Sequence, residues 1–241
     1  MTNPRVAVFR PDDGRLADAA ELLRSLGATP VADPMLAVEP AGTAPRSDAD
    51  FTVFTSTTGV ELAADAGWDP GDTTVCAIGE TTAASLRDAG FAVDIVPETY
   101  TSDGLVSTLE GSVDGARVEL ARSDHGSSVL VEGLSDAGAY VHETVLYRLV
   151  RPDGAGESAE KAAAGELEAA LFTSSLTVEH FLAAATDRGV REEAIEGLNA
   201  GTVGVIGPPT ERTAESAGSD VDVVPDRADF ERLARATLDA Q

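Results

Sequence analysis

The sequence contains the same order of short motifs twice. The first copy reads Phe54-Thr55-Ser56, Ile78-Gly79-Glu80-Thr81-Thr82 and Val93-Asp94-Ile95-Val96-Pro97. The second copy reads Phe172-Thr173-Ser174, Ile206-Gly207-Pro208-Pro209-Thr210 and Val221-Asp222-Val223-Val224-Pro225. The glycine and the final proline are 18 residues apart in both copies, whereas the serine and the glycine are 23 apart in the first and 33 in the second. The repeat predicts two similar lobes, with a longer loop in the second and a ligand-binding cleft between them.

Strand and helix patterns alternate along the chain. Short apolar runs predict buried strands at residues 6–9, 51–54, 75–78, 93–96, 117–121, 141–150, 169–172, 203–206 and 221–224. Helical spacing of apolar residues predicts helices at 16–26, 57–66, 81–89, 103–109, 127–137, 177–185, 211–217 and 230–238. This alternation predicts an α/β fold of two flavodoxin-like domains, each a parallel sheet with helices on both faces. Residues 153–164 have low complexity and are expected to form a mobile loop.

The two copies are not equally complete. The second copy lacks a first strand and helix, which the amino-terminal strand and helix can supply. We therefore expect a discontinuous domain, residues 1–36 with 152–241, that encloses an inserted domain at 37–151. The chain crosses between the domains twice, through an extended segment at 34–40 and through the long strand at 141–150. These crossings are expected to pair as a two-stranded β-ladder linker that permits hinge motion.

Acidic residues dominate the composition. Asp and Glu number 42 against 17 Lys and Arg, the net charge is −25, and Lys161 is the only lysine. Together with regular apolar periodicity, this composition is typical of folded, acidic proteins from halophilic cells with a salt-rich cytoplasm. A functional acidic patch is the alternative. Binding to nucleic acid is excluded because phosphate recognition needs clusters of Lys and Arg, which the sequence lacks.

Membrane, metal and nucleotide functions have no support in the sequence. The apolar runs are strand-sized and the chain opens on the strand-like Arg5-Val6-Ala7-Val8-Phe9, so we expect a cytoplasmic protein with no membrane partner. Glycine-rich nucleotide motifs are absent and the three histidines are scattered, so no metal and no cofactor is predicted. The single cysteine, Cys76, is expected in the core. Neither lobe shows a spare apolar face, which predicts a monomer.

Hydroxyl-bearing residues and glycines follow four of the predicted strands. They are Ser56 and Thr57, Gly79 and Thr82, Ser174 and Ser175, and Gly207 and Thr210. In open parallel sheets, the carboxyl ends of the strands and the helix N-termini after them form the ligand crevice. Unpaired backbone N–H groups there favour anions such as carboxylates. The alternative for each hydroxyl is an ordinary N-cap, which contributes about 1 kcal/mol without any ligand.

The chain contains, in order, Phe-Thr-Ser, Ile-Gly-x-x-Thr, Val-Pro, Leu-Tyr, and again Phe-Thr-Ser with Ile-Gly-Pro-x-Thr. This order of motifs resembles that of the uroporphyrinogen-III synthase family over nearly the whole chain. The resemblance implies two domains joined by a β-ladder and a cyclising lyase that uses no cofactor or metal. The implied small-molecule substrate is hydroxymethylbilane, which closes to uroporphyrinogen III with inversion of ring D and loss of water in tetrapyrrole and heme biosynthesis. This unstable substrate also suggests transient contact with the preceding enzyme of the pathway.

The resemblance also implies roles for individual residues. Tyr147, in Val145-Leu146-Tyr147, corresponds to the family's tyrosine and could act as a general acid or positioning group for the departing hydroxyl of ring A. Its alternative is a structural residue that fills a domain junction. Hydroxyl positions of the family match Ser56, Thr82 and Thr210, with Ser174 and Ser175 as further substrate-binding residues. Pro209 and Glu211, which flank Thr210, depart from the family pattern.

Two functions remain open from the sequence. One is the synthase. The other is a non-catalytic, two-lobed binding protein that closes on a small anionic ligand, because no strongly nucleophilic or acid–base constellation is present.

Overall fold

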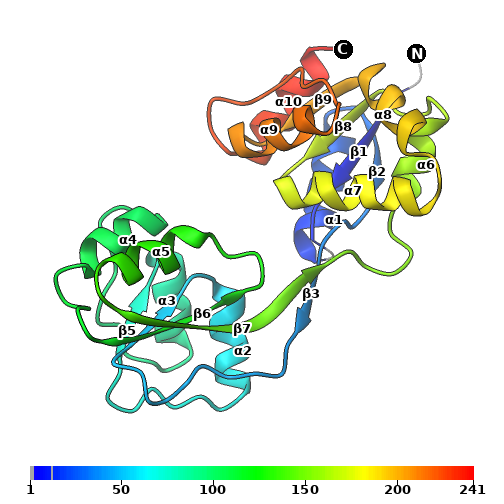
Figure 1. Cartoon of the computed structure of the whole chain (residues 1–241). Coiled ribbons are helices and arrows are strands. Elements are labelled where there is room, and N and C mark those ends of the chain that lie inside the picture. The colour runs from blue at the N-terminus through cyan, green and yellow to red at the C-terminus, as the bar shows by residue number, and fades with distance from the viewer. Residues whose placement is uncertain (1–2, 12) are drawn as a thin grey trace. The chain divides into compact units, whose positions relative to one another are not determined.

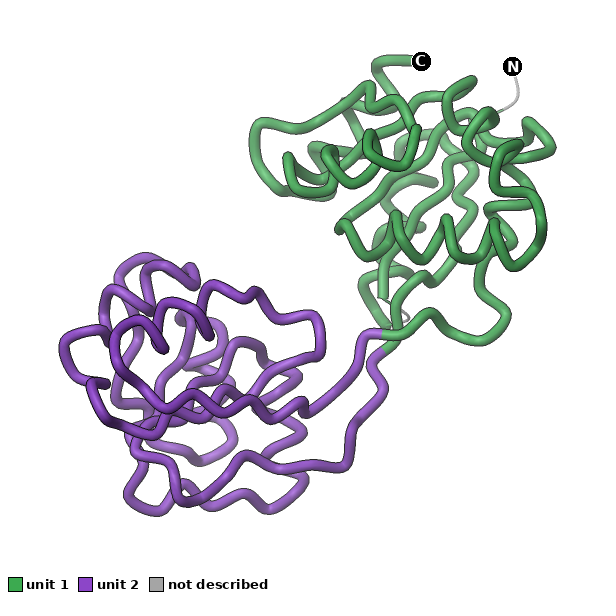
Figure 2. The backbone as a smooth tube through the Cα atoms, in the orientation of Figure 1, with its two compact units in different colours: residues 1–37, 150–241 green, residues 38–149 purple. Residues whose placement is uncertain are grey.

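The computed structural model describes residues 3–11 and 13–241. The chain forms two compact units (Figure 2): unit 1 comprises Met1–Ala37 with Val150–Gln241, and unit 2 comprises Val38–Leu149. The inserted domain expected at residues 37–151 is longer than unit 2 by one residue at its start and by two at its end. Each unit is described by itself below.

Unit 1 contains a four-stranded sheet in the order β2-β1-β8-β9 (Figure 1). Its strands are β1 (Arg5–Phe9), β2 (Thr29–Ala32), β8 (Ala169–Phe172) and β9 (Thr202–Val205), and each neighbouring pair is parallel. Its helices are α1 (Gly14–Ser25), α6 (Glu157–Ala163), α7 (Ser175–Asp187), α8 (Arg191–Asn199), α9 (Pro208–Ser216) and α10 (Phe230–Asp239). Along β1, Ala7 and Phe9 enter one apolar cluster while Val6 and Val8 enter another, so helices cover both faces of the sheet.

Unit 2 contains a five-stranded sheet in the order β3-β7-β6-β4-β5. Its strands are β3 (Ala37–Pro40), β4 (Phe51–Phe54), β5 (Thr74–Ala77), β6 (Arg117–Ser123) and β7 (Tyr140–Val150), and its helices are α2 (Thr57–Asp65), α3 (Glu80–Asp88), α4 (Ser102–Leu109) and α5 (Ser128–Asp136). The pairs β4–β5, β4–β6 and β6–β7 are parallel. Phe54 packs with α2 and α3, and Val53 packs with α4 and α5 on the other face. At the sheet edge β3 lies beside β7, which agrees with the predicted ladder.

Two of the predicted strands, at residues 93–96 and 221–224, are wrong. Each segment forms a single isolated bridge, Cys76 with Ile95 and Gly204 with Val223. In both units an aspartate carboxylate replaces a backbone acceptor and accepts the neighbouring strand's N–H at 2.8 Å, in the pairs Asp94 with Val75 and Asp222 with Val203. Since a side chain occupies this ladder position, regular backbone pairing does not extend past the bridge.

The expectation of a mobile loop at residues 153–164 is also wrong, because the segment contains α6. A buried carboxylate caps this helix: Asp33, only 4% exposed, accepts the backbone N–H groups of Gly156 and Ser158, each at 2.9 Å. The Gly156 backbone has a φ of 111°, a left-handed conformation that favours glycine. Asp33 precedes Gly156 by 123 residues, so no local sequence pattern could predict this cap.

The extra residues of the second copy form a helix instead of a longer loop. They build α8, which packs on α6, and a side chain at Gly197 would collide with the Ala162 carbonyl of that helix. Strand β2 was likewise not expected. It is a short edge strand that contains Pro30, and such a strand carries no alternating pattern of buried residues.

We expect Asp94→Ala to lower the free energy of unfolding by about 1–3 kcal/mol, because the buried Val75 N–H loses its acceptor. Chemical denaturation at high salt measures this loss. Asp94→Asn keeps an oxygen in place and is the matched control, with a smaller loss. Asp222→Ala is expected to cost about as much, because unit 1 repeats the contact. Equal losses for the Ala and Asn variants would contradict the role of the carboxylate as a ladder acceptor.

Candidate functional site

All four predicted turns form N-caps at the carboxyl ends of strands. The cap residues are Ser56 of α2, Gly79 of α3, Ser174 of α7 and Gly207 of α9. Each serine hydroxyl accepts an N–H from the first turn of its helix, Ser56 from Gly59 at 3.0 Å and Ser174 from Thr177 at 3.2 Å. The serines are therefore N-caps, and any contact with a ligand comes in addition. Thr57 and Ser175 begin their helices, where N–H groups have no intrahelical partner.

Two of the predicted residues, Tyr147 and Ser56, are in direct contact. The Tyr147 hydroxyl donates a hydrogen bond to Ser56 Oγ at 3.0 Å. The tyrosine is 7% exposed and belongs to the apolar cluster that contains Phe54 and Trp68. Because Ser56 Oγ accepts from both Tyr147 and the first turn of α2, its own hydrogen is available to a further acceptor.

A β-bulge in β7 orients Tyr147. Arg122 pairs with Val145, but the next residue, Ser123, pairs with Tyr147, so Leu146 is the additional residue. Successive strand residues normally point to opposite faces, whereas Leu146 and Tyr147 enter the same apolar cluster. The bulge thus turns the tyrosine toward the cap of α2, as bulges beside active sites re-aim side chains.

The predicted serines of unit 1 belong to one connected edge. Ser175 Oγ donates to the Pro209 carbonyl at 3.1 Å and so joins the starts of α7 and α9. Ser174 completes a capping box, because its N–H donates to Thr177 Oγ1 at 3.2 Å. Thr173 Oγ1 donates to the Phe9 carbonyl at 2.7 Å, which ties the end of β1 to the turn before α7.

Thr82 and Thr210 do not lie on the accessible edge. They are the third residues of α3 and α9, and they are only 5% and 3% exposed. The structure places both side chains beneath the starts of their helices, not on the surface where hydroxyl contact with a ligand was expected.

The expected N–H donors are missing at one helix. At the start of α9, Pro208 and Pro209 have no N–H. The N–H groups of Thr210 and Glu211 donate to the Gly207 carbonyl at 3.0 and 3.1 Å. An anion at this edge of unit 1 would therefore meet N–H donors at the start of α7 and not at the start of α9.

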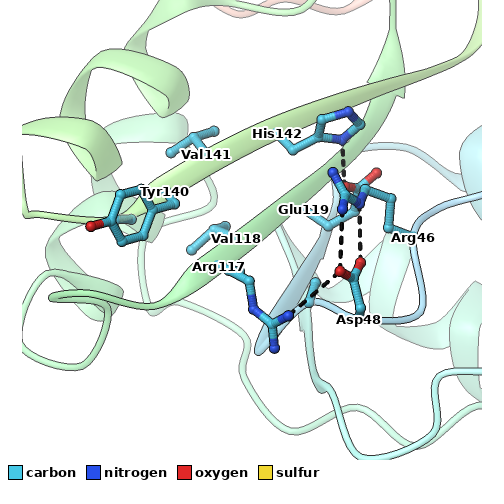
Figure 3. A pocket seen from close by; sticks show the side chains of 10 residues that line it. Arg46, Asp48, Arg117, Val118, Glu119, Tyr140, Val141 and His142 are labelled. Carbon is cyan, nitrogen blue, oxygen red and sulfur yellow. Dashed lines mark hydrogen bonds and ion pairs between the residues drawn. The ribbon is translucent and has the colours of Figure 1, made fainter.

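Unit 2 also has a groove and a hollow on its surface. The groove, of about 760 Å³, lies between α2 and α3 and includes Thr57 and Thr81 in its lining. Figure 3 shows the hollow, of about 460 Å³, where β6 and β7 begin; its lining includes Arg46, Asp48, Arg117, Glu119, Tyr140 and His142. Asp48 pairs with both arginines there, which compensates part of their charge. None of the predicted site residues lines this hollow, because they follow the opposite ends of parallel strands.

Metal and membrane sites were not expected. Within residues 3–11 and 13–241, no three His, Cys, Asp or Glu side chains are grouped to hold a metal ion. Burial raises the pKa of the Cys76 thiol to about 12, so the thiol stays protonated in the core. No helix in the described part of the chain is long and apolar enough to span a bilayer. The absence of a cofactor stays a prediction.

One residue on the edge of unit 1 is not a hydroxyl and was missed. Arg10 directly follows β1, whose last residue, Phe9, pairs with Phe172 at the end of β8. The signal was present in the sequence, because Arg10 follows a buried strand just as Thr55 and Thr173 do.

Fold and site together define a duplicated, two-domain α/β protein with polar strand ends and one tyrosine held against a helix cap. The family profile described as uroporphyrinogen-III synthase HemD matches residues 17–235. A protein of Methanothermobacter thermautotrophicus, provisionally named a uroporphyrinogen-III synthase, is 36% identical, and the match covers 92% of each chain.

Solved structures agree with this fold. A mutant uroporphyrinogen III synthase of the extremely thermophilic bacterium Thermus thermophilus is similar with a TM-score of 0.68 at 21% identity, covering 98% of both chains. The uroporphyrinogen-III synthetase of Helicobacter pylori is similar with a TM-score of 0.61 at 14% identity, covering 98% of this chain and 100% of that one. The chain belongs to the uroporphyrinogen-III synthase family. The predicted family, fold class and enzyme class, a cyclising lyase, are confirmed.

Gly79 and Gly207 cap equivalent helices in different surroundings. A Cβ at Gly79 would lie 3.2 Å from Cβ and Cγ of Tyr100, whereas nothing lies within 4 Å of a Cβ at Gly207. Both backbones are extended, with φ of −171° and 175°, so alanine fits the backbone at either position.

We expect Gly207→Ala to change the free energy of unfolding by less than about 0.5 kcal/mol, and Gly79→Ala to cost about 1 kcal/mol because Tyr100 must move. Denaturation curves measure both, and Tyr100→Ala in the Gly79→Ala background is expected to remove the cost. Turnover of the Gly207→Ala variant then tests its binding role. Lower activity at unchanged stability is expected if substrate approaches Gly207 closely, and full activity would exclude that approach.

Proposed function

We propose that the chain converts hydroxymethylbilane to uroporphyrinogen III, with inversion of ring D and loss of water, and that Tyr147 assists the departure of the ring A hydroxyl. Family membership supports the reaction. The observation that carries the role of Tyr147 is its hydrogen bond to Ser56 Oγ, 3.0 Å long, at the polar edge of unit 2.

The two hydroxyls can exchange roles as donor and acceptor. In the free protein Tyr147 donates to Ser56. When the Tyr147 hydrogen turns to the leaving hydroxyl of the substrate, Ser56 can donate its own hydrogen to the tyrosine oxygen. The tyrosine oxygen then stays hydrogen-bonded as it assists the leaving group, which costs less than leaving a buried polar atom without a partner. Loss of the hydroxyl as water takes up one proton, which a phenol can supply or orient.

Carboxylates of the substrate require electropositive partners, which this acidic chain supplies through its backbone. We propose that the starts of α2, α3 and α7 bind them with N–H groups at Thr57, beside Gly79 and at Ser175. Each exposed helix start favours a negative charge by about 0.3–1 kcal/mol. Substrate reaches these edges at the turns formed by Ser56, Ser174 and Gly207. Beneath the helix starts, the buried Thr82 and Thr210 support α3 and α9.

Control of substrate conformation is the larger part of the proposed catalysis. A linear bilane that closes end to end gives the symmetric I isomer, so the protein must hold ring D for attack at its substituted carbon. Contacts with the polar strand ends would orient the reacting ends and exclude water.

Isomer analysis tests the reaction. Hydroxymethylbilane is supplied to the protein in multimolar KCl, and the products are separated by chromatography. We expect the III isomer in excess over a protein-free control. Formation of the I isomer alone, at the uncatalysed rate, would contradict the synthase and favour the non-catalytic binding protein.

We expect Tyr147→Phe to lower kcat/KM by about 10- to 100-fold, because the substrate loses its hydrogen-bond donor. Ser56→Ala is expected to have a smaller effect, because Tyr147 remains. The matched control is Tyr140→Phe, which removes a hydroxyl from a residue that is 71% exposed, beside the hollow of Figure 3. A Tyr147→Phe enzyme with the full rate of isomer III formation would remove Tyr147 from the mechanism.

The acidic composition supports a further part of this proposal, that the chain works as a cytoplasmic monomer in a salt-rich cell. With a net charge of −25, self-repulsion opposes the folded state at low ionic strength. Added salt screens this self-repulsion, since the Debye length falls from about 10 Å at 0.1 M to about 3 Å at 1 M.

We expect the midpoint of thermal unfolding to rise as KCl is raised from dilute to multimolar concentration, and circular dichroism measures this midpoint. A midpoint independent of KCl would contradict salt adaptation.

A further inference from the structure

Arg10 lies half-buried at the carboxyl end of β1 without a counter-ion among the described residues. Its Nε is buried and has no hydrogen-bond partner within residues 3–11 and 13–241. Its guanidinium carbon lies 4.8 Å from the ring centroid of Phe230, the first residue of α10. Stacking on an aromatic face keeps a guanidinium flat and in one place, while its edge with the N–H groups stays free to bind.

A half-buried arginine with no ion pair among the described residues is unusual in this chain. Acidic residues outnumber basic ones by 42 to 17, so arginines find carboxylates easily. The other arginines that form no ion pair within the described residues are all exposed, namely Arg24, Arg148, Arg191, Arg212 and Arg227. The nearby acid Asp13 is already engaged, because Arg15 Nη2 binds its Oδ2 at 2.6 Å.

The described carboxylates near Arg10 offset its burial only in part. Desolvation lowers the pKa of Arg10 below its usual value, and the positive charge of Arg15 lowers it further, against the opposing effect of Asp13 and Asp18. An arginine stays charged at neutral pH even so. A desolvated cation with an unpartnered N–H has most to gain from an incoming anion.

The contacts of β1 place Arg10 on the predicted ligand edge. Phe9, the preceding residue, accepts a hydrogen bond from Thr173 Oγ1 at 2.7 Å, and Thr173 precedes the cap residue of α7. Phe9 also pairs with Phe172 across β1 and β8, so Arg10 leaves the sheet beside the turn that leads to Ser174. The free N–H groups at the start of α7 and the guanidinium therefore belong to the same edge of unit 1.

We propose that Arg10 binds a carboxylate group of the substrate and is the cationic specificity residue of unit 1. This inference rests on the proposed function, whose substrate is a polycarboxylate. The planar guanidinium matches a carboxylate in a two-point contact, which backbone N–H groups at α7 can extend. Phe230 holds the guanidinium in the orientation for this contact.

Arg10→Gln is the main test, and Arg24→Gln is the matched control, because it removes an exposed arginine that forms no ion pair with any described residue. For Arg10→Gln we expect KM for hydroxymethylbilane to rise about 10- to 100-fold, the range of a charge-assisted pair, with a much smaller change in kcat. Arg10→Lys keeps the charge but loses the two-point contact, so an intermediate KM is expected. The denaturation midpoint of Arg10→Gln is expected to equal that of the control.

Binding of uroporphyrin III, the stable oxidised product, separates this inference from the reaction. Fluorescence titration at fixed KCl is expected to show weaker binding for Arg10→Gln than for wild type and for Arg24→Gln. The proposal is overturned if the two variants bind and turn over alike, or if Arg10→Gln loses stability in proportion to its activity. If wild type yields only the I isomer, the proposed function fails, and the titration still decides whether Arg10 binds carboxylates.

Discussion

Parallel pairing of the strands is the constraint on which the rest of each unit depends. Because β1, β8 and β9 run in one direction in unit 1, and β4, β5, β6 and β7 in unit 2, all these strands end at one edge of their sheet. The chain must then return over a face of the sheet, which it does as a helix that begins at that edge. Caps, free N–H groups and polar side chains gather there for this reason, and an acidic chain can meet an anionic ligand without a basic patch.

Comparison of the two copies distinguishes the contacts that both units share from the contacts that differ. Asp94 and Asp222 accept a strand N–H at the same distance of 2.8 Å, because each completes the ladder at a point where the sheet would otherwise bury an unpaired donor. The edges differ. Tyr100 covers the cap of α3, whereas two prolines begin α9 and leave Gly207 open. The shared aspartates complete the ladder in both units, whereas the surroundings of the two helix caps differ.

Tyr147 and Arg10 share one physical situation. Each is a partly buried polar group oriented by a packing feature: a β-bulge for the tyrosine and the Phe230 ring for the arginine. A polar group that is partly removed from water gains more from a ligand than an exposed one, because less hydration is lost on binding.

The sequence by itself determined most of the alternating strands and helices, the internal repeat, the caps at Ser56 and Ser174 and the family, but not β2, α6 and α8. These follow from local periodicity and from motifs a few residues long. Even the loss of donors at α9 could have been foreseen, since Pro208 and Pro209 have no N–H. The tertiary structure alone decided that Tyr147 reaches Ser56 across 91 residues and that Asp33 caps α6 across 123. It also buried Thr82 and Thr210, because contacts between distant segments depend on register, bulges and packing that no local pattern encodes.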